Sequence, residues 1–264
     1  MVKSLTRIRR FMFRVLFQFG GVTITTYGVM LAIAFIAGII LAERRGIRYG
    51  VPKDTVGNLS LLILLGAIAG SRAFYVLTHL SDYSGEWQRA FYVWEGGLTF
   101  YGGVILAFLL CVIWVRKKGL SFGKLADTIA PSLALGIGIG RIGCFLNGCC
   151  FGKPSNFGVV FPLDSPCAWE LGVGVRVHPT QLYSSFAGFC IFGILLLLEK
   201  KKKFSGELLV WFFLLYSLWR FSIDFIRYYS PSAYIFPNIT NNQVVSAVVF
   251  ILSLIVMIHW RKKP

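Results

Sequence analysis

Phe186-Ala-Gly-Phe-Cys-Ile-Phe-Gly-Ile-Leu-Leu-Leu-Leu198 is a run of thirteen residues without a charge or a proline. Its apolar side chains do not alternate with polar ones, so the run predicts a helix that is apolar all round rather than a strand with one wet face. Lipid admits only helices and closed barrels as spanning structures. With its apolar neighbours, the run approaches the ~20 residues that a helix needs to cross a bilayer.

Six other stretches of the chain share this apolar, unbroken character. The predicted spans are 21–42, 57–79, 98–115, 125–148, 182–198, 207–227 and 243–260. Of the 264 residues, 56% are hydrophobic and only 14% are charged, against roughly 25% charged residues in an ordinary soluble domain. This composition excludes a soluble globular enzyme and a disordered chain. We therefore expect an all-α polytopic membrane protein with about seven transmembrane helices.

Basic residues are distributed unevenly around these spans. The chain has 27 Lys and Arg against 11 Asp and Glu, a net charge of +16; in so apolar a chain this indicates anionic lipid headgroups as partners, and no nucleic acid. The segments after the first, third, fifth and seventh spans hold most of them: Arg44, Arg45, Arg48, Lys53, Arg116, Lys117, Lys118, Lys124, Lys200, Lys201, Lys202, Lys203, Arg261, Lys262 and Lys263. The other connections hold Arg89, Lys153 and Arg176. The positive-inside rule then predicts a cytoplasmic C-terminus and an outer N-terminus.

The N-terminal segment opposes this orientation. It carries basic residues that the rule would keep inside: Lys3, Arg7, Arg9, Arg10 and Arg14. Because residues 4–19 mix Arg with Phe and Leu, we expect 1–20 to be a basic amphipathic segment that lies in the membrane interface as a helix. Residues 21–264 are expected to form the seven-helix transmembrane domain, with an outer loop region at about 149–181.

Four arginines remain within predicted spans or near their outer ends: Arg72, Arg141, Arg220 and Arg227. Charged side chains in a membrane are costly and by default indicate function, although an Arg can also reach the interface or pair with an acid. Arg220, Asp224 and Arg227 are spaced by four and three residues, so on a helix they share one face. Two Arg against one Asp leave that face positive, and a guanidinium group fits a phosphate. We predict a site for an anionic phospholipid headgroup.

A glycine-rich stretch ends the fourth span and continues through Gly143, Asn147 and Gly152. Its earlier glycines are explained by close helix packing, and no βα unit precedes it to make a nucleotide-binding loop. The later glycines flank Arg141 and Asn147. Exposed backbone beside an Arg and an Asn predicts a cradle for a phosphate or an oxyanion.

Six cysteines are present, and four of them gather around the same place. Cys144, Cys149 and Cys150 lie at the outer end of the fourth span and Cys167 in the following loop, whereas Cys111 and Cys190 are mid-span. A disulfide from Cys149 or Cys150 to Cys167 is one alternative. A catalytic cysteine is another, and it would require a nearby base. Without a CxxC pair a zinc site is disfavoured, so we expect neither a metal nor a cofactor.

Two short motifs begin the third and fifth spans. They contribute Tyr101, Gly102, Gly103, His178, Gln181 and Tyr183. The alternatives to a functional role are an interfacial aromatic anchor for Tyr101 and a structural hydrogen bond for His178.

In their order along the chain, these segments resemble the prolipoprotein diacylglyceryl transferase family. The stretch from Gly140 to Gly152 is similar to the family signature. The further matching segments are Tyr27-Gly28, Gly70-Ser-Arg72 with Tyr75, Gly96 to Gly103, His178-Pro-Thr-Gln181-Leu-Tyr183, Arg220 with Asp224 and Arg227, and Gln243 with Ser246. The resemblance covers about residues 20–260.

The resemblance implies a bacterial inner-membrane enzyme that moves the diacylglyceryl group of phosphatidylglycerol to the lipobox cysteine thiol of a preprolipoprotein and releases glycerol 1-phosphate. Its implied partners are phosphatidylglycerol, the lipobox signal peptide and membrane lipids. Arg141, Arg227 and Tyr101 then become the catalytic candidates. The implied substrate-binding residues are Tyr27, Arg72, Gly102, Gly103, Gly143, Asn147, Gly152, His178, Gln181, Tyr183, Arg220 and Asp224.

This chain departs from the family pattern at several positions. Tyr101 stands where the family usually has His, and a phenol with a pKa of ~10 is a poor base unless an Arg lowers that value. The base is therefore Tyr101, the substrate phosphate, or dispensable. Cys144 replaces an Asn, Cys149 an acid often found there, and Ser184 a Glu.

Two other functions stay open at this point. One is a divergent paralogue that modifies another thiol acceptor or uses another lipid. The other is an anion transporter lined by arginines, although the sequence shows no internal repeat of its helices.

Overall fold

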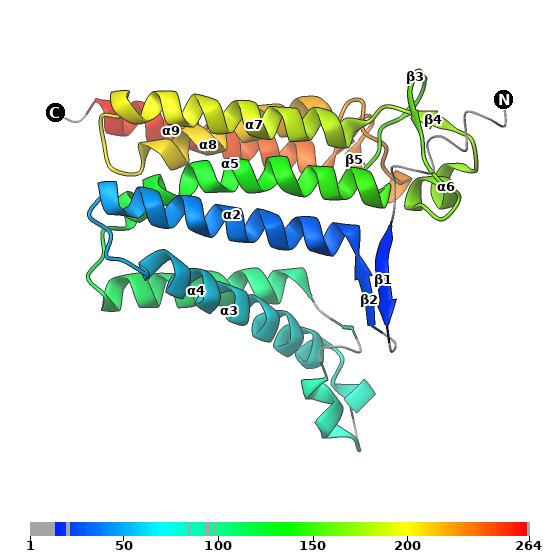
Figure 1. Ribbon diagram of the computed structural model, residues 1–264, viewed down its shortest axis with the longest axis horizontal. Coiled ribbons are helices and arrows are strands. Elements are labelled where there is room, and N and C mark those ends of the chain that lie inside the picture. Colours follow the sequence, from blue (N-terminus) through cyan, green and yellow to red (C-terminus); the bar gives the residue numbers. More distant parts are fainter. Residues whose placement is uncertain (1–13, 20–21, 84, 93–95, 98, 263–264) are drawn as a thin grey trace. The chain divides into compact units, whose positions relative to one another are not determined.

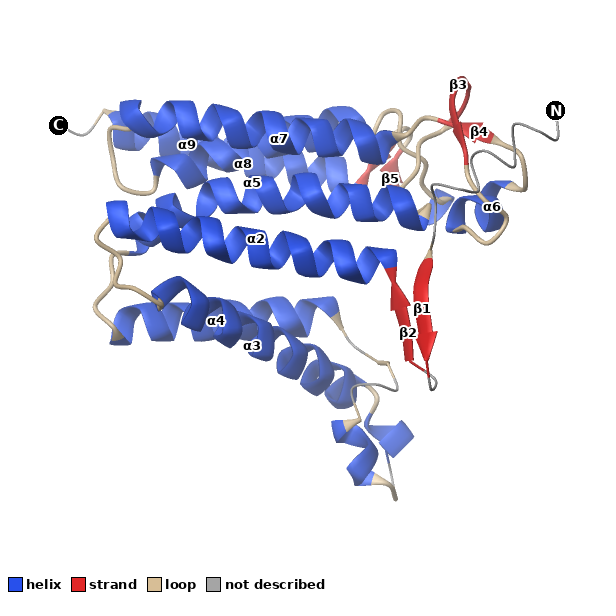
Figure 2. Cartoon of the chain, in the orientation of Figure 1, coloured by secondary structure: helices blue, strands red, loops and turns tan. Residues whose placement is uncertain are grey.

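The computed structural model describes residues 14–262, apart from 20–21, 84, 93–95 and 98. The chain is mostly helical (Figures 1 and 2). Its long helices are α2 (Thr26–Arg48), α3 (Thr55–Thr78), α4 (Phe100–Lys117), α5 (Phe122–Asn147), α7 (Thr180–Leu198), α8 (Glu207–Ile223) and α9 (Asn241–Arg261). Each predicted span overlaps one of these helices.

Five helices in the described part of the chain have the length and hydropathy to cross a membrane. They are α2, α3, α5, α7 with its extension to Lys201, and α9. This finding confirms an α-helical membrane protein. The predicted spans 98–115 and 207–227 overlap α4 and α8, which are 18 and 17 residues long. At ~1.5 Å per residue, α8 extends for about 26 Å.

The helix predicted for the N-terminal segment is wrong where the structure describes it, whereas its place in the membrane interface stays a prediction. Val15–Phe19 (β1) pairs antiparallel with Val22–Thr25 (β2), so these residues form strands, and the first long helix begins at Thr26 rather than at 21. All four residues of β2 are β-branched, which favours a strand over a helix. Arg14 lies over the Trp169 ring, 4.8 Å from its centroid. Residues 1–13 lie outside the described part.

The chain divides into two compact units, residues 42–125 and residues 1–41 with 126–264. In the larger unit, α5, α7 and α8 surround a core of Ala130, Ala134, Ile191, Leu195, Leu208 and Phe212. Gly138 and Gly188 let α5 and α7 approach closely, because a Cβ on Gly188 would lie 2.8 Å from the Gly138 nitrogen. Ser185 also donates to the Gly138 carbonyl at 2.7 Å. The packing role expected for the early glycines is confirmed at Gly138.

Buried acids anchor the start of α5 and α8. Asp127 is fully buried, pairs with Lys202 at 2.9 Å and accepts the backbone N–H of Gly206 and Leu208 at 2.8 Å each. Glu207 pairs with Arg261. These contacts fix the basic connection after α7 against the helix bundle.

The region predicted as an outer loop at 149–181 is folded. It contains β3 (Pro154–Val160), the short helix α6 (Pro166–Leu171) and β4 (Arg176–Val177), and β3 and β4 pair antiparallel. Its core is Phe151, Phe161, Cys167 and Val177. Figure 1 shows α6, β3, β4 and the strand β5 (Tyr234–Phe236), which pairs with β6 (Ile239–Thr240), gathered at one end of α5 and α7. We call the region formed by β3, α6, β4, β5 and β6 the platform. It positions the residues described next.

In the smaller unit, α3 and α4 form a tightly packed pair. A Cβ on Gly102 would lie 2.3 Å from the Phe74 Cβ, and one on Gly103 would lie 2.3 Å from the Ser71 hydroxyl. These glycines therefore have a packing role between two helices, which the sequence motif alone did not reveal.

Candidate functional site

Arg141 is carried by the last turns of α5. Its guanidinium group is half-buried and interacts with the Tyr216 hydroxyl of α8. Among the described residues, no carboxylate lies within ion-pair distance of Arg141. The positive charge is therefore held by a phenol rather than neutralised by an acid.

Arg227 lies beyond the end of α8, which corrects the expectation that it continues the helix to residue 227. The helix ends at Ile223, and Arg227 forms an isolated antiparallel bridge with Gly152. The Lys153 N–H donates to the Ile226 carbonyl at 2.8 Å, and the Tyr228 N–H donates to the Phe151 carbonyl at 3.1 Å. Arg227 is thus fixed by the platform and not by the helical face it was expected to share with Arg220.

Gly152 makes this bridge possible. Its N–H donates to the His178 carbonyl at 2.9 Å, and a Cβ there would lie 2.6 Å from the His178 Cβ and 2.9 Å from the Ile226 carbonyl oxygen. No larger residue fits between the segments that carry His178 and Arg227. The glycine predicted to cradle a ligand therefore acts by bringing two backbones together.

The guanidinium group of Arg227 has no carboxylate partner among the described residues. It lies 5.2 Å from the centroid of the Tyr229 ring, an attractive cation–π arrangement. Its Nε is buried without a hydrogen-bond partner. Throughout the described residues, no acid forms an ion pair with it. A half-buried guanidinium whose Nε has no partner is unfavourable unless an anion completes it.

Arg220 and Asp224 form a closed network instead. Arg220 donates to Asp224 and, at 2.6 Å, to the Tyr229 hydroxyl. Asp224, only 2% exposed, also accepts from the hydroxyls of Tyr229 at 2.9 Å and Thr240 at 3.0 Å. This acid neutralises Arg220, so the net positive charge predicted for the triplet resides on Arg227.

The turn after α5 is held by α7. The Gln181 Nε2 donates to the Cys149 carbonyl at 2.7 Å, and the Thr180 hydroxyl donates to the Cys150 carbonyl at 2.8 Å. Gly148 and Cys150 both adopt positive φ, 73° and 62°. A non-glycine residue rarely takes this conformation and persists in it only when its surroundings enforce it.

Three thiols meet at this turn. The sulfur atoms of Cys144, Cys149 and Cys150 all lie within 4.8 Å of one another. Hydrogen bonds from the other two thiols, with the charges of Arg227 and Arg141, lower the pKa of the Cys150 thiol. The Asn147 side chain lies within hydrogen-bond reach of Cys149.

Cys167 stands apart from the three thiols. All six cysteines are free, so the disulfide considered between Cys149 or Cys150 and Cys167 is not formed. Burial in the platform core raises the pKa of the Cys167 thiol to about 11. It behaves as a small core residue.

Tyr27, in the first turn of α2, lies close to this cluster and to Arg141. Gly143 allows the approach, because a Cβ there would lie 2.9 Å from the Met30 Cβ and 3.4 Å from the Tyr27 ring. Tyr27 is 38% exposed. One guanidinium, three thiols and a phenol thus share one neighbourhood.

His178 and Tyr183 border the same platform. Their ring centroids are 6.4 Å apart, and the His178 Nδ1 is buried without a hydrogen-bond partner. The Gln181 Oε1 is likewise buried and unpartnered. Two further buried polar atoms in this region therefore have no hydrogen-bond partner.

Four predicted site residues belong to the smaller unit. Arg72, 6% exposed, donates to the carbonyls of Ala90, Gly96 and Arg89 at 2.9, 2.5 and 2.5 Å, and to that of Gly97 at 3.3 Å. Tyr101 is 71% exposed. The other two, Gly102 and Gly103, pack against α3, as described above.

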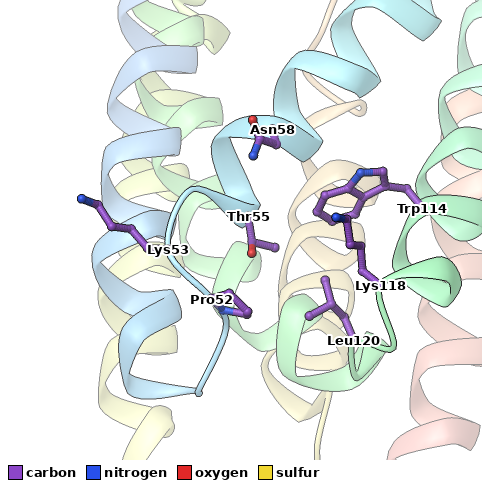
Figure 3. A pocket seen from close by; sticks show the side chains of 7 residues that line it. All are labelled: Pro52, Lys53, Thr55, Asn58, Trp114, Lys118 and Leu120. Carbon is purple, nitrogen blue, oxygen red and sulfur yellow. The ribbon is translucent and has the colours of Figure 1, made fainter.

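A separate pocket of about 380 Å³ opens at the start of α3 in this smaller unit (Figure 3). Its lining residues are Pro52, Lys53, Thr55, Asn58, Trp114, Lys118 and Leu120. None of them is a predicted site residue, and the lining contains neither a thiol nor a carboxylate.

Three supporting residues escaped the sequence analysis. Tyr216 contacts Arg141, Tyr229 joins Arg220 to Asp224 and covers Arg227, and Thr180 clamps Cys150. The spacing of Tyr216 four residues before Arg220 offered a signal, because such pairs share a helical face. Tyr229 follows Arg227 after the helix has ended, so helical periodicity could not identify it.

Comparison with known proteins identifies clear relatives. A family model described as prolipoprotein diacylglyceryl transferase matches residues 14–259. Phosphatidylglycerol–prolipoprotein diacylglyceryl transferase of Finegoldia magna is 33% identical over 251 residues, 95% of this chain and 96% of the relative. The proteins of the same name from Geobacillus kaustophilus and Clostridioides difficile are 36% and 34% identical over 254 and 251 residues; each match covers 95% of this chain, with 93% and 96% of the relatives.

Proposed function

The chain belongs to the prolipoprotein diacylglyceryl transferase family, and from that premise we propose that it transfers the diacylglyceryl group of phosphatidylglycerol to the lipobox cysteine of a preprolipoprotein. This reaction is the first step of bacterial lipoprotein maturation. The observation that carries the proposal is the pair of guanidinium groups, Arg141 and Arg227, that lack a carboxylate partner among the described residues. The names of the relatives favour neither a transporter nor another acceptor.

The two arginines hold the phosphate of the lipid. In the reaction, the acceptor sulfur forms a bond to the glyceryl carbon that bears the phosphate, and the carbon–oxygen bond breaks. The electron pair leaves with the oxygen, so negative charge develops on that oxygen before the monoester glycerol 1-phosphate takes up the thiol proton. Guanidinium groups fixed beside that oxygen stabilise the charge as it develops, which lowers the barrier to reaction.

The supporting contacts keep these charges in place before the lipid arrives. Tyr216 orients Arg141, and the Gly152 bridge orients the backbone of Arg227. The Arg220–Asp224 network supports the segment behind Arg227. Asp224 does not compete with the phosphate for Arg227, because three other side chains already engage it. Preorganised charges cost little reorganisation when the leaving group forms.

The acceptor thiol must lose its proton in the same step. Tyr101 and the substrate phosphate are the two groups that can take it in this chain. Tyr101 is 71% exposed, and an exposed phenol is a weak base near neutral pH. The departing phosphate gains negative charge as the sulfur attacks, so the proposal assigns the proton to the phosphate.

The protein spans the bacterial inner membrane seven times in this proposal, with the N-terminus outside and the C-terminus in the cytoplasm. Two contacts support this orientation, because they place the N-terminal segment and the basic connection after α7 at opposite ends of α5. Arg14 lies on Trp169 beside the last turn of α5, whereas Lys202 pairs with Asp127 near the first turn of the same helix. The phosphate site then lies near the outer face.

The test uses the purified full-length protein in detergent or liposomes. It is incubated with phosphatidylglycerol labelled in its acyl chains and with a lipobox peptide. We expect a peptide with a diacylglyceryl thioether on its cysteine, together with one equivalent of glycerol 1-phosphate. A peptide whose cysteine is serine is the control. Anion flux through the liposomes without a thioether product would overturn the proposal.

A further inference from the structure

The cluster formed by Cys144, Cys149 and Cys150, here called the thiol cluster, has no assigned part in the transfer reaction. Cys144 belongs to the last turns of α5 and is 8% exposed, and the other two are half-buried in the following turn. Their sulfur atoms lie within 4.8 Å of one another. Three soft donors from one short segment therefore point to a common position.

The spacing fits a metal ion. Thiolate sulfur binds zinc at ~2.3 Å, and three such bonds at trigonal or tetrahedral angles place the sulfur atoms about 4 Å apart. The thiol cluster reaches this spacing by side-chain adjustments of about an ångström at most, without movement of the helix. Thiolate ligands select soft ions of the Cu⁺ and Zn²⁺ class over hard ones.

The backbone of the cluster is held in place. Cys150 has a φ of 62°, and its carbonyl and that of Cys149 are fixed by Thr180 and Gln181 of α7. Gln181 is 1% exposed, and its Oε1 is buried without a partner. A site whose donors are held by packed neighbours loses little freedom when it takes up an ion.

The neighbouring charges suit an anionic complex. Three thiolates with Cu⁺ carry a charge of –2, and with Zn²⁺ a charge of –1. Arg141 and Arg227 act electrostatically on Cys150, and neither has a carboxylate partner in the described ranges. Two positive charges therefore offset a metal–thiolate centre that would otherwise be costly to bury.

We propose that Cys144, Cys149 and Cys150 form a three-thiolate site for a thiophilic d¹⁰ metal ion, with Cu⁺ bound by the sulfurs alone and Zn²⁺ completed by water. Binding replaces three S–H protons by one ion, and the protons pass to solvent. No electron transfer is involved. The site forms without a CxxC pair. The end of a helix and the left-handed turn after it bring the three thiols together, which the spacing in the sequence does not show.

Occupation has a consequence for the arginines that rests on the proposed function. A metal–thiolate centre with a negative charge competes with the lipid phosphate for Arg141 and Arg227. Stoichiometric metal is therefore expected to inhibit the transfer reaction, and a chelator is expected to restore it. The thiol cluster would then make the enzyme sensitive to thiophilic metals.

The experiment titrates the reduced full-length protein with Cu⁺ under anaerobic conditions, and separately with Zn²⁺, against a chromophoric chelator. We expect one equivalent per chain and a thiolate-to-metal charge-transfer band with Cu⁺. Cys150→Ser and Cys149→Ser should each weaken binding by about tenfold or more. Cys167→Ser, which removes a buried thiol from the same platform, should bind as the wild type does.

Two results would overturn the metal site. One is binding that Cys150→Ser and Cys149→Ser leave unchanged. The other is no binding of either ion to the reduced protein, in which all three thiols still react with an alkylating agent. Thermal unfolding of each variant separates lost ligands from lost fold. Metal binding is measured without the substrates, so a protein that binds metal but makes no thioether contradicts only the proposed function.

Discussion

Arg72 and Arg227 are both arginines that the chain places out of full contact with water, yet their surroundings differ. The guanidinium of Arg72 donates to four backbone carbonyls from the segment 89–97 and lies 5.5 Å from the Tyr83 ring centroid. The guanidinium of Arg227 lies on Tyr229 with its Nε unpartnered. The donors of Arg72 are thus hydrogen-bonded within the protein, whereas the Nε donor of Arg227 has no partner.

We propose that this difference separates an arginine that organises the fold from one that serves the reaction. Carbonyl groups satisfy the donors of Arg72 and organise the connection before α4, so that arginine has little capacity left for a ligand. Arg227 and Arg141 are costly to bury as they stand, and an external phosphate would complete them. The sequence motifs place all three arginines at the site, and their partners show which of them keep donors for a ligand.

Removing the open charges should have the largest effect. Arg227→Gln and Arg141→Gln each remove a group that stabilises the leaving phosphate, so we expect kcat/KM to fall by about 10²–10³-fold. The labelled-lipid assay measures the loss. Thermal unfolding should change little, because neither arginine has an acid partner in the described residues. Activity within threefold of the wild type in both variants would contradict the assignment.

Asp224→Asn tests the closed network behind Arg227. The change leaves Arg220 buried beside a neutral amide, and breaking a buried pair costs about 3–5 kcal/mol of unfolding free energy. Denaturant unfolding in detergent should report this loss, while kcat/KM per folded molecule falls less than in Arg227→Gln. Asp224→Glu is the matched control that retains the charge. A fall in kcat/KM per folded molecule larger than that of Arg227→Gln, with little loss of unfolding free energy, would place Asp224 in contact with substrate.

Arg72→Lys tests the saturated site. Lysine keeps the charge but cannot reach four carbonyls with a planar fork, so we expect a loss of about 1–3 kcal/mol in stability. The backbone at Arg89, Ala90, Gly96 and Gly97, whose carbonyls Arg72 holds, should become more susceptible to limited proteolysis. Retained protection of these residues, together with a hundredfold loss of activity, would show that Arg72 serves the substrate rather than the loop.

Tyr101→Phe should have the smallest effect. If the substrate phosphate takes the thiol proton, loss of the exposed phenol should change kcat by no more than about threefold, and the pH profile should keep its shape. A fall of about 10²-fold, the size expected for loss of a general base, would instead identify Tyr101 as that base.

The long helices could be predicted from the sequence because hydropathy is a local property of about 20 residues. The position of Arg227 could not, because it depends on a strand-like bridge to Gly152 that forms between distant segments. The hairpin of Val15–Phe19 was missed for a related reason: mixed Arg, Phe and Leu suit an amphipathic helix, but the β-branched partner strand Val22–Thr25 decides the pairing.

The composition of the site followed the same division. That Arg141, Asn147, His178 and Gln181 belong to the candidate site could be predicted from their motifs. Their partners could not, because Tyr216 and Tyr229 lie outside the matching segments, and Thr180, although within one, was not singled out as a site residue. The separation of the thiol cluster from Cys167 also required the fold, since the spacing along the chain allowed a disulfide among them.

The contrast between the two arginines is tested most directly by binding of phosphatidylglycerol to three purified proteins in the same detergent: the wild type, Arg227→Gln and Arg72→Lys. Native mass spectrometry gives the dissociation constant of the lipid without the need for turnover. We expect Arg72→Lys to bind within about twofold of the wild type and Arg227→Gln to bind at least tenfold more weakly, the ~1.4 kcal/mol that a charge-assisted hydrogen bond supplies. Wild-type affinity in Arg227→Gln with lost affinity in Arg72→Lys would contradict the account.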